Sequence, residues 1–129
     1  MITELAAWVA VILFFWLMCF QILLALGFPY GKAAWGGKYI KLPSRLRIAS
    51  LFSAVVFVVA SLFVLEKANI LSIFNSSTLV TVGVWILVAF FGLNTLSNLA
   101  SKSKLEKRVM TPISLTLALL CLIVAITAN

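Results

Sequence analysis

Four long apolar runs constrain this chain more than any other feature. They cover about residues 5–26, 46–65, 78–100 and 110–128. Runs of roughly 18–25 residues are long enough for an α-helix to cross a hydrocarbon core of ~30 Å. Hydrophobic residues make up 64% of the 129 positions and charged residues only 10%, which leaves little polar surface for a soluble fold. The sequence therefore predicts one all-α integral membrane domain, 1–129, folded as an antiparallel four-transmembrane-helix bundle.

The basic residues lie mainly in two of the three predicted connections. One group falls in the connection at 27–45 and just after it: Lys32, Lys38, Lys41, Arg45 and Arg47. The second group falls between the third and fourth spans: Lys102, Lys104, Lys107 and Arg108. The opposite side has only Lys67. The positive-inside rule places both basic connections in the cytoplasm, so both termini are predicted to lie outside.

The net charge of +7 raises the question of a nucleic-acid partner. We predict none, because the basic residues flank membrane spans. Orientation signals and attraction to anionic lipid explain such a position directly. The expected partners are membrane lipids, with anionic headgroups at the cytoplasmic face. A homo-oligomer or a larger membrane complex is compatible with so small a core.

Helix-end signals mark the boundaries of the spans. Gly27 and Pro29 are expected to end the first span, and Ser44 is expected to be the N-cap of the second. Small residues recur at helical spacing along the second span, so one of its faces permits close helix packing. These small residues are Ser50, Ala54 and Ser61.

The start of the fourth span has two interpretations. Ser103 and Glu106 have the capping-box spacing, with Glu106 reaching back to the N-cap, which predicts a helix from Lys104 that kinks at Pro112. Alternatively, the helix begins afresh with Thr111 as N-cap and Pro112 at the first helical position.

Polar side chains within the spans gather at one depth. Given the predicted orientation, they lie near the cytoplasmic ends of their helices and form a candidate polar site: Gln21, Ser50, Asn94, Ser97 and Asn98. Polar groups in hydrocarbon are costly when unpaired and tend to face the bundle interior. They either hydrogen-bond one another as structural contacts, or line a pocket or part of a pore open to the cytoplasm, or meet another protein.

The first connection interleaves aromatic and basic residues. Such a pattern is typical of a loop seated among lipid headgroups. The alternative is a specific contact for an anionic headgroup or ligand, made by glycine N–H groups and arginine side chains. The residues for that contact are Trp35, Gly36, Gly37, Arg45 and Arg47.

Catalysis is not expected from this composition. The chain has no His and no Asp, and its carboxylates, Glu4, Glu66 and Glu106, lie near different span ends. No pair of them is placed for general acid and base chemistry. Cys19 and Cys121 form neither a disulfide framework nor a metal-binding spacing. We therefore predict no enzyme activity, no metal and no cofactor.

Three motifs in order resemble a group of small, uncharacterised four-span bacterial integral membrane proteins. They are Gly27-x-Pro29-x-Gly31 followed by Trp35-Gly36-Gly37, Leu42-Pro43 followed by Arg47 and Ser50, and Asn98-x-x-Ser101-x-Ser103-x-x-Glu106 followed by Thr111-Pro112. The resemblance covers nearly the whole chain. It implies a multi-pass protein of the bacterial cell inner (plasma) membrane, and it implies no activity.

Two functions fit these observations. The first is a transport or channel component with a cytoplasm-facing polar site. The alternative is a non-catalytic accessory or lipid-binding scaffold subunit of a larger membrane complex. A water- or ligand-filled space beside Asn94 and Asn98 favours the first, whereas a dry, hydrogen-bonded layer favours the second.

Overall fold

A computed structural model describes residues 1–128, so Asn129 lies outside the described part of the predicted domain. It contains four long α-helices: α1 (Ile2–Ala25), α2 (Ser44–Lys67), α3 (Ser77–Leu99) and α4 (Lys104–Thr127). Two short 3₁₀ turns lie between α1 and α2: η1 (Gly31–Ala33) and η2 (Trp35–Gly37). All four α-helices are long and apolar enough to cross a membrane. The prediction of an all-α chain with four such helices is confirmed.

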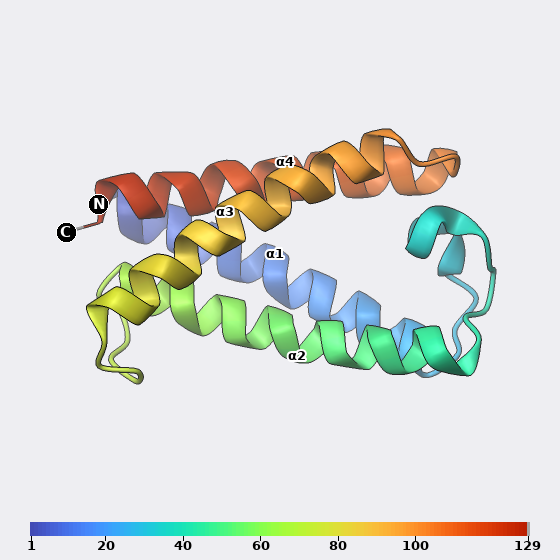
Figure 1. The fold of residues 1–129 in the computed structure, drawn as a ribbon, viewed down its shortest axis with the longest axis horizontal. Helices are drawn as coiled ribbons and strands as arrows, with labels where there is room; N and C mark the ends of the chain where they lie inside the picture. Colours follow the sequence, from blue (N-terminus) through green and yellow to red (C-terminus); the bar gives the residue numbers. More distant parts are fainter. Residues whose placement is uncertain (129) are drawn as a thin grey trace.

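The helices form two pairs that diverge toward one end of the molecule. Helix α1 packs along α2, and α3 packs along α4; α1 also contacts α4. Figure 1 shows α3 crossing from the α2 side, at the left, to the α4 side, at the right. The connection between α1 and α2 lies at the right-hand end, in the space between the two pairs. We call this the loop end, and the opposite end, where both termini lie, the terminal end.

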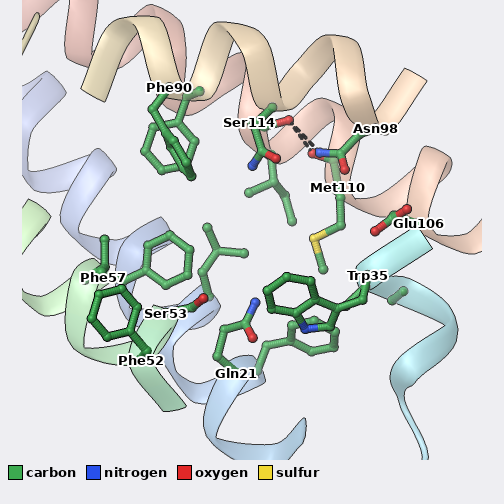
Figure 2. A pocket seen from close by; sticks show the side chains of 18 residues that line it. Gln21, Trp35, Phe52, Ser53, Phe57, Phe90, Asn98, Glu106, Met110 and Ser114 are labelled. Carbon is green, nitrogen blue, oxygen red and sulfur yellow. Dashed lines mark hydrogen bonds between the residues drawn. The ribbon is translucent and has the colours of Figure 1, made fainter. Parts of the chain in front are cut away.

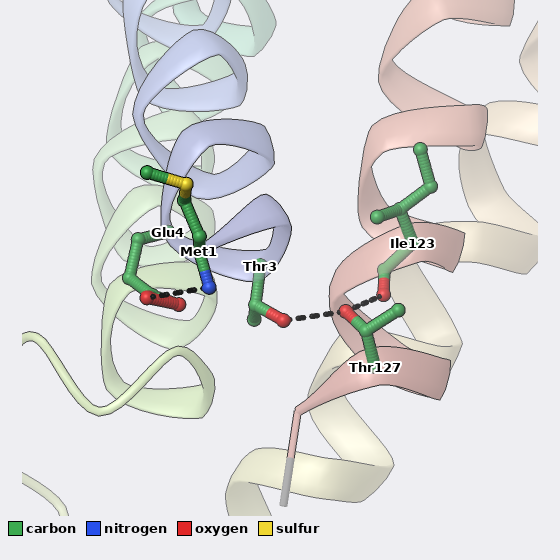
Figure 3. Close-up of polar contacts among 5 residues, drawn as sticks. All are labelled: Met1, Thr3, Glu4, Ile123 and Thr127. Atoms are coloured by element: carbon green, nitrogen blue, oxygen red, sulfur yellow. Dashed lines mark hydrogen bonds and ion pairs between the residues drawn. The ribbon is translucent and has the colours of Figure 1, made fainter.

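The terminal end is closely packed. The Thr3 and Thr127 hydroxyls are hydrogen-bonded at 2.6 Å, which joins the start of α1 to the end of α4 (Figure 3). On α3, Gly83 lies against the ring of Phe63 from α2, with no room for a side chain between them. A small residue therefore permits a close contact between α2 and α3 at this point.

Three phenylalanines from three helices form a cluster within the core. Phe14, Phe57 and Phe91 have ring centroids 5.6–6.3 Å apart. Each ring is buried, and the distances suit stacked or tilted aromatic contacts. The cluster ties α1, α2 and α3 together. Large apolar side chains on the outward faces, such as Leu93 and Ile12, are exposed, as expected where a helix faces lipid.

The predicted N-cap of α2 is wrong, and that of α4 is confirmed only in part. Helix α2 has Pro43 as its N-cap residue, and Ser44 is already helical, with no capping hydrogen bond from its side chain. At α4, Ser103 accepts from the Glu106 N–H as predicted. However, Glu106 does not reach back to Ser103; its carboxylate instead accepts from the Gly36 N–H. The contact of Glu106 with Gly36 has therefore replaced the predicted contact with Ser103.

Helix α4 follows the first of the two interpretations of its start. It runs without a break from Lys104, so Pro112 lies inside the helix and not at its first position. Thr111 is consequently within the helix, and its hydroxyl has no hydrogen-bond partner among the described residues.

Candidate functional site

A cavity of about 460 Å³ lies between the two helix pairs, toward the loop end. We call it the central cavity (Figure 2). All four α-helices and the first connection contribute to it. Its apolar lining is Leu17, Phe20, Ala33, Ala34, Trp35, Phe52, Val56, Phe57, Phe90, Phe91, Met110 and Ile113. Its polar lining is Gln21, Ser53, Asn94, Asn98, Glu106 and Ser114.

The central cavity is closed toward the terminal end and bounded by exposed residues at its side. Phe57 and Phe91 line it and belong to the buried phenylalanine cluster, so that cluster forms its base. Phe52 on α2 and Phe90 on α3 also line it, yet they are 70% and 50% exposed. The cavity therefore reaches the outer surface between α2 and α3, and the phenylalanine cluster bounds it toward the terminal end.

A second pocket, of about 600 Å³, lies beside the first. We call it the loop-end pocket. It is lined by Trp35, Gly36, Asn94, Ser97, Asn98, Ala100, Ser101, Lys102 and Glu106. Four of these residues also line the central cavity: Trp35, Asn94, Asn98 and Glu106. The two spaces are therefore adjacent and share these four residues.

Trp35 is held at this boundary in an unusual backbone conformation. Its φ is 53°, in the left-handed region that bulky residues rarely adopt. The indole Nε1 donates to Ser50 Oγ on α2 at 3.0 Å. Ser50 is fully buried, so this bond also satisfies a hydroxyl that has no access to solvent. These contacts place the indole in the wall of the central cavity.

The other side of the connection is fixed to the start of α4. The Gly36 N–H donates to Glu106 Oε2 at 3.3 Å, and the Ser103 hydroxyl donates to the Lys32 carbonyl. Gly37, with φ 71°, packs directly against the Ser103 side chain. The connection therefore bridges the two helix pairs, with Trp35 bonded to α2 and Gly36 bonded to α4.

The polar side chains of the central cavity are only partly paired. Asn98 Nδ2 donates to Ser114 Oγ at 3.1 Å, and the Ser114 hydroxyl donates to the Met110 carbonyl at 2.7 Å. Gln21 Oε1 is buried and has no partner among the described residues. In Figure 2, Gln21 lies across the cavity from Asn98 and Ser114. The described residues show no hydrogen bond that joins Gln21 to Asn94 or Asn98, so the mutual network considered from the sequence is not formed.

The predicted polar residues fall in different places around the two pockets. Gln21, Asn94 and Asn98 line the central cavity. Ser97 is exposed and lines only the loop-end pocket, while Ser50 lies behind Trp35 and lines neither.

The residues predicted to contact an anion are also separated. Trp35 and Gly36 line the loop-end pocket. The Gly36 and Gly37 N–H groups are already paired, with Glu106 and with the Ala34 carbonyl. Arg47 Nε donates to the Ala25 carbonyl at 2.8 Å, and Arg45 donates to the Tyr39 hydroxyl at 3.3 Å. Neither arginine lines either pocket.

Glu106 is the lining residue that the sequence analysis assigned to a different role. Its spacing from Ser103 indicated a helix cap, and nothing local indicated a contact with Gly36, 70 positions earlier. Ser114 likewise lines the central cavity and lies outside the polar site predicted from the sequence. Among residues 1–128, no three His, Cys, Asp or Glu side chains are grouped as metal ligands.

Comparison of the chain with family models, with curated proteins and with solved structures gives no match. The geometry of the two pockets is therefore the basis for the function proposed below.

Proposed function

We propose that this chain is a small multi-pass protein of the bacterial inner membrane that binds a solute from the cytoplasmic side, as a transport component. The observation that supports this best is the central cavity, whose polar residues Gln21, Asn94 and Asn98 lie toward the loop end. A cavity of about 460 Å³ is within the size range of small-molecule sites. The protein acts by binding and movement of its ligand, without catalysis.

The proposed orientation places the loop end in the cytoplasm and both termini outside. Lys32, Lys38 and Lys102, which flank that end, are exposed. Basic side chains in this position favour the cytoplasmic face and its anionic lipids. The four helices then cross the membrane as an antiparallel bundle. In that arrangement the loop-end pocket faces the cytoplasm, and the phenylalanine cluster separates the central cavity from the outside.

Cysteine labelling tests this function without knowledge of the solute. In a Cys19→Ala, Cys121→Ala background, Asn94→Cys places a thiol in the wall shared by both pockets. Thiols react as thiolates, which form readily only in water. A charged, membrane-impermeant thiol reagent applied to the cytoplasmic face of inverted vesicles should label Asn94→Cys.

Leu93→Cys is the matched control. Leu93 is the neighbour of Asn94 on α3 but is 67% exposed on the outward face, so its thiol should lie in lipid and stay unlabelled. Equal labelling of the two variants, or labelling of Asn94→Cys only from the outside, would refute a cytoplasm-facing site.

A second candidate function is a lipid-binding scaffold. The exposure of Phe52 and Phe90 at the side of the cavity favours it, because that opening lies between two membrane-compatible helices. In this case Asn94→Cys should be shielded from the charged reagent by bound lipid and become reactive after delipidation in detergent.

A further inference from the structure

Glu106 is a buried carboxylate without a basic partner. Its residue is 7% exposed. Among residues 1–128, the one ion pair within 4.0 Å joins the N-terminus to Glu4, so no lysine or arginine pairs with Glu106. Its carboxylate accepts a single hydrogen bond, from the Gly36 N–H at 3.3 Å. Buried carboxyl groups are normally paired with a cation or with several hydrogen-bond donors, so this one is suited to a cation supplied by a ligand.

Aromatic rings surround much of the central cavity. They are Phe20, Trp35, Phe52, Phe57, Phe90 and Phe91. The face of an aromatic ring attracts a cation, and this attraction is stronger where water is excluded. Gln21 adds a buried oxygen that has no hydrogen-bond donor, so the cavity also offers an acceptor to an N–H group. Each of these features favours a positively charged ligand with an apolar body.

An anion is a poor fit for the same space. No lysine or arginine lines the central cavity within the described residues. The Gly36 N–H, which an anion would need, already donates to the carboxylate of Glu106. An anion at this position would meet that carboxylate without a compensating donor. The lining of the central cavity therefore lacks the positive charge that the exposed lysines give to the surface of the loop end.

We propose that the central cavity binds a lipophilic organic cation, with the cationic centre beside Glu106 and the apolar or aromatic body among the phenylalanines. This assignment rests on the proposed function, because it names the class of solute for the same cavity. The exposed Phe52 and Phe90 at the side would let such a molecule enter from the membrane as well as from the loop-end pocket.

Tetraphenylphosphonium and tetraphenylborate form a suitable pair of probes, because they share one shape and carry opposite charges. Ser53→Cys, in the background without native cysteines, puts a reporter thiol in the cavity wall. Tetraphenylphosphonium should slow its reaction with the uncharged reagent N-ethylmaleimide. Adding Glu106→Gln should raise the half-protecting concentration about tenfold, because the charge partner is lost while Gln can still accept from Gly36.

The two ions partition differently into detergent or lipid. This difference cancels when the same ion is compared between variants under one condition. Glu4→Gln neutralises an exposed carboxylate in the first turn of α1, at the terminal end, and should leave protection unchanged. Phe90→Leu should weaken protection by tetraphenylphosphonium about threefold through the lost aromatic face. Its control, Phe15→Leu, alters an exposed ring outside the cavity and should have no effect.

Two results would overturn the cation assignment. One is equal protection by tetraphenylphosphonium with and without Glu106→Gln and Phe90→Leu. The other is stronger, Glu106-independent protection by tetraphenylborate. If either occurs while Asn94→Cys is still labelled from the cytoplasmic face and Leu93→Cys is not, the proposed function stands and only the ligand class fails. If Asn94→Cys also fails that test, the proposed function fails with it.

Discussion

Arg45 and Arg47 lie two positions apart at the start of α2 and differ in what they contact. Arg47 Nε donates to the carbonyl of Ala25, the last residue of α1. That carbonyl has no partner within its own helix, and a positive group there also suits the negative end of the helix dipole. Arg45 is exposed and donates only to the Tyr39 hydroxyl, at 3.3 Å. Arg47 therefore joins the start of α2 to the end of α1, whereas Arg45 makes only an exposed contact.

We expect Arg47→Gln to destabilise the protein by about 1–2 kcal/mol, because a charged hydrogen bond to a helix end is lost. Arg45→Gln should change stability by less than about 0.5 kcal/mol, as is usual for an exposed contact. Both variants remove one positive charge beside the same span, so each serves as the control for the other. Thermal unfolding in one detergent measures the difference; equal effects would show that the Ala25 contact adds no stability.

At the scale of elements, two glycines of α3 differ in their surroundings. A Cβ at Gly83 would overlap the Phe63 ring of α2, whereas a Cβ at Gly92 would meet nothing within 4 Å. Gly83 therefore sets the spacing of α2 and α3 near the terminal end. Gly92 imposes no such spacing.

Gly83→Ala should cost about 1–3 kcal/mol, because the added methyl group overpacks the α2–α3 contact. Gly92→Ala should be neutral or stabilise by up to about 1 kcal/mol, since Ala is the better helix former. Unfolding midpoints of the two variants against the parent provide the measurement. A Gly83→Ala protein as stable as Gly92→Ala would mean that Phe63 moves aside freely.

Two adjacent glycines in the connection between α1 and α2 differ in the same way. Gly36 and Gly37 both have positive φ, but only Gly37 lacks space for a Cβ, because the Ser103 side chain occupies it. Gly36→Ala should add only the backbone cost, about 1 kcal/mol. Gly37→Ala should in addition release the connection from α4. Faster trypsin cleavage at Lys32 and Lys38 in inverted vesicles would reveal this release, and equal cleavage of both variants would contradict it.

The helices could be predicted from the sequence, whereas the folded connection could not. Apolar runs report helix length directly, because hydrocarbon requires internally satisfied backbone. The positive φ of Trp35 and the contact of Gly36 with Glu106 arise from packing between segments that are distant in the chain. The local Ser103–Glu106 spacing even indicated a different partner for the carboxylate. Of the five residues grouped by depth, Gln21, Asn94 and Asn98 line the central cavity, whereas Ser50 and Ser97 do not. Depth gave no information on which side chains pair.

At the scale of the whole molecule, the two ends differ in how the helices are joined. At the terminal end, Gly83 packs against Phe63 and Thr3 hydrogen-bonds to Thr127, and a further pocket of about 370 Å³ lies at the α2–α3 connection. The loop end contains the central cavity and the loop-end pocket. The connection that bridges the helix pairs there is bonded to α2 through Trp35 and to α4 through Glu106 and Ser103. The proposed cytoplasm-facing site would require the helix pairs to move apart at the loop end.

The proposed orientation in the membrane rests on the distribution of basic residues and can be tested by removing these residues in steps. Replacing Lys102, Lys104, Lys107 and Arg108 with Gln leaves five basic residues beside the first connection against Lys67 on the other side. The remaining bias should still keep both termini outside. A phosphatase fused to the C-terminus should therefore stay active, and a green fluorescent protein fused there should stay dark.

Replacing the five basic residues of the first connection and the start of α2 as well removes nearly all of the bias. That protein should insert in both orientations, because Lys67 alone gives little preference. Both fusions should then report intermediate signals, with protein levels matched by immunoblotting. A C-terminal fluorescent fusion that is bright in the unaltered chain would invert the orientation and would place the loop-end pocket outside the cell.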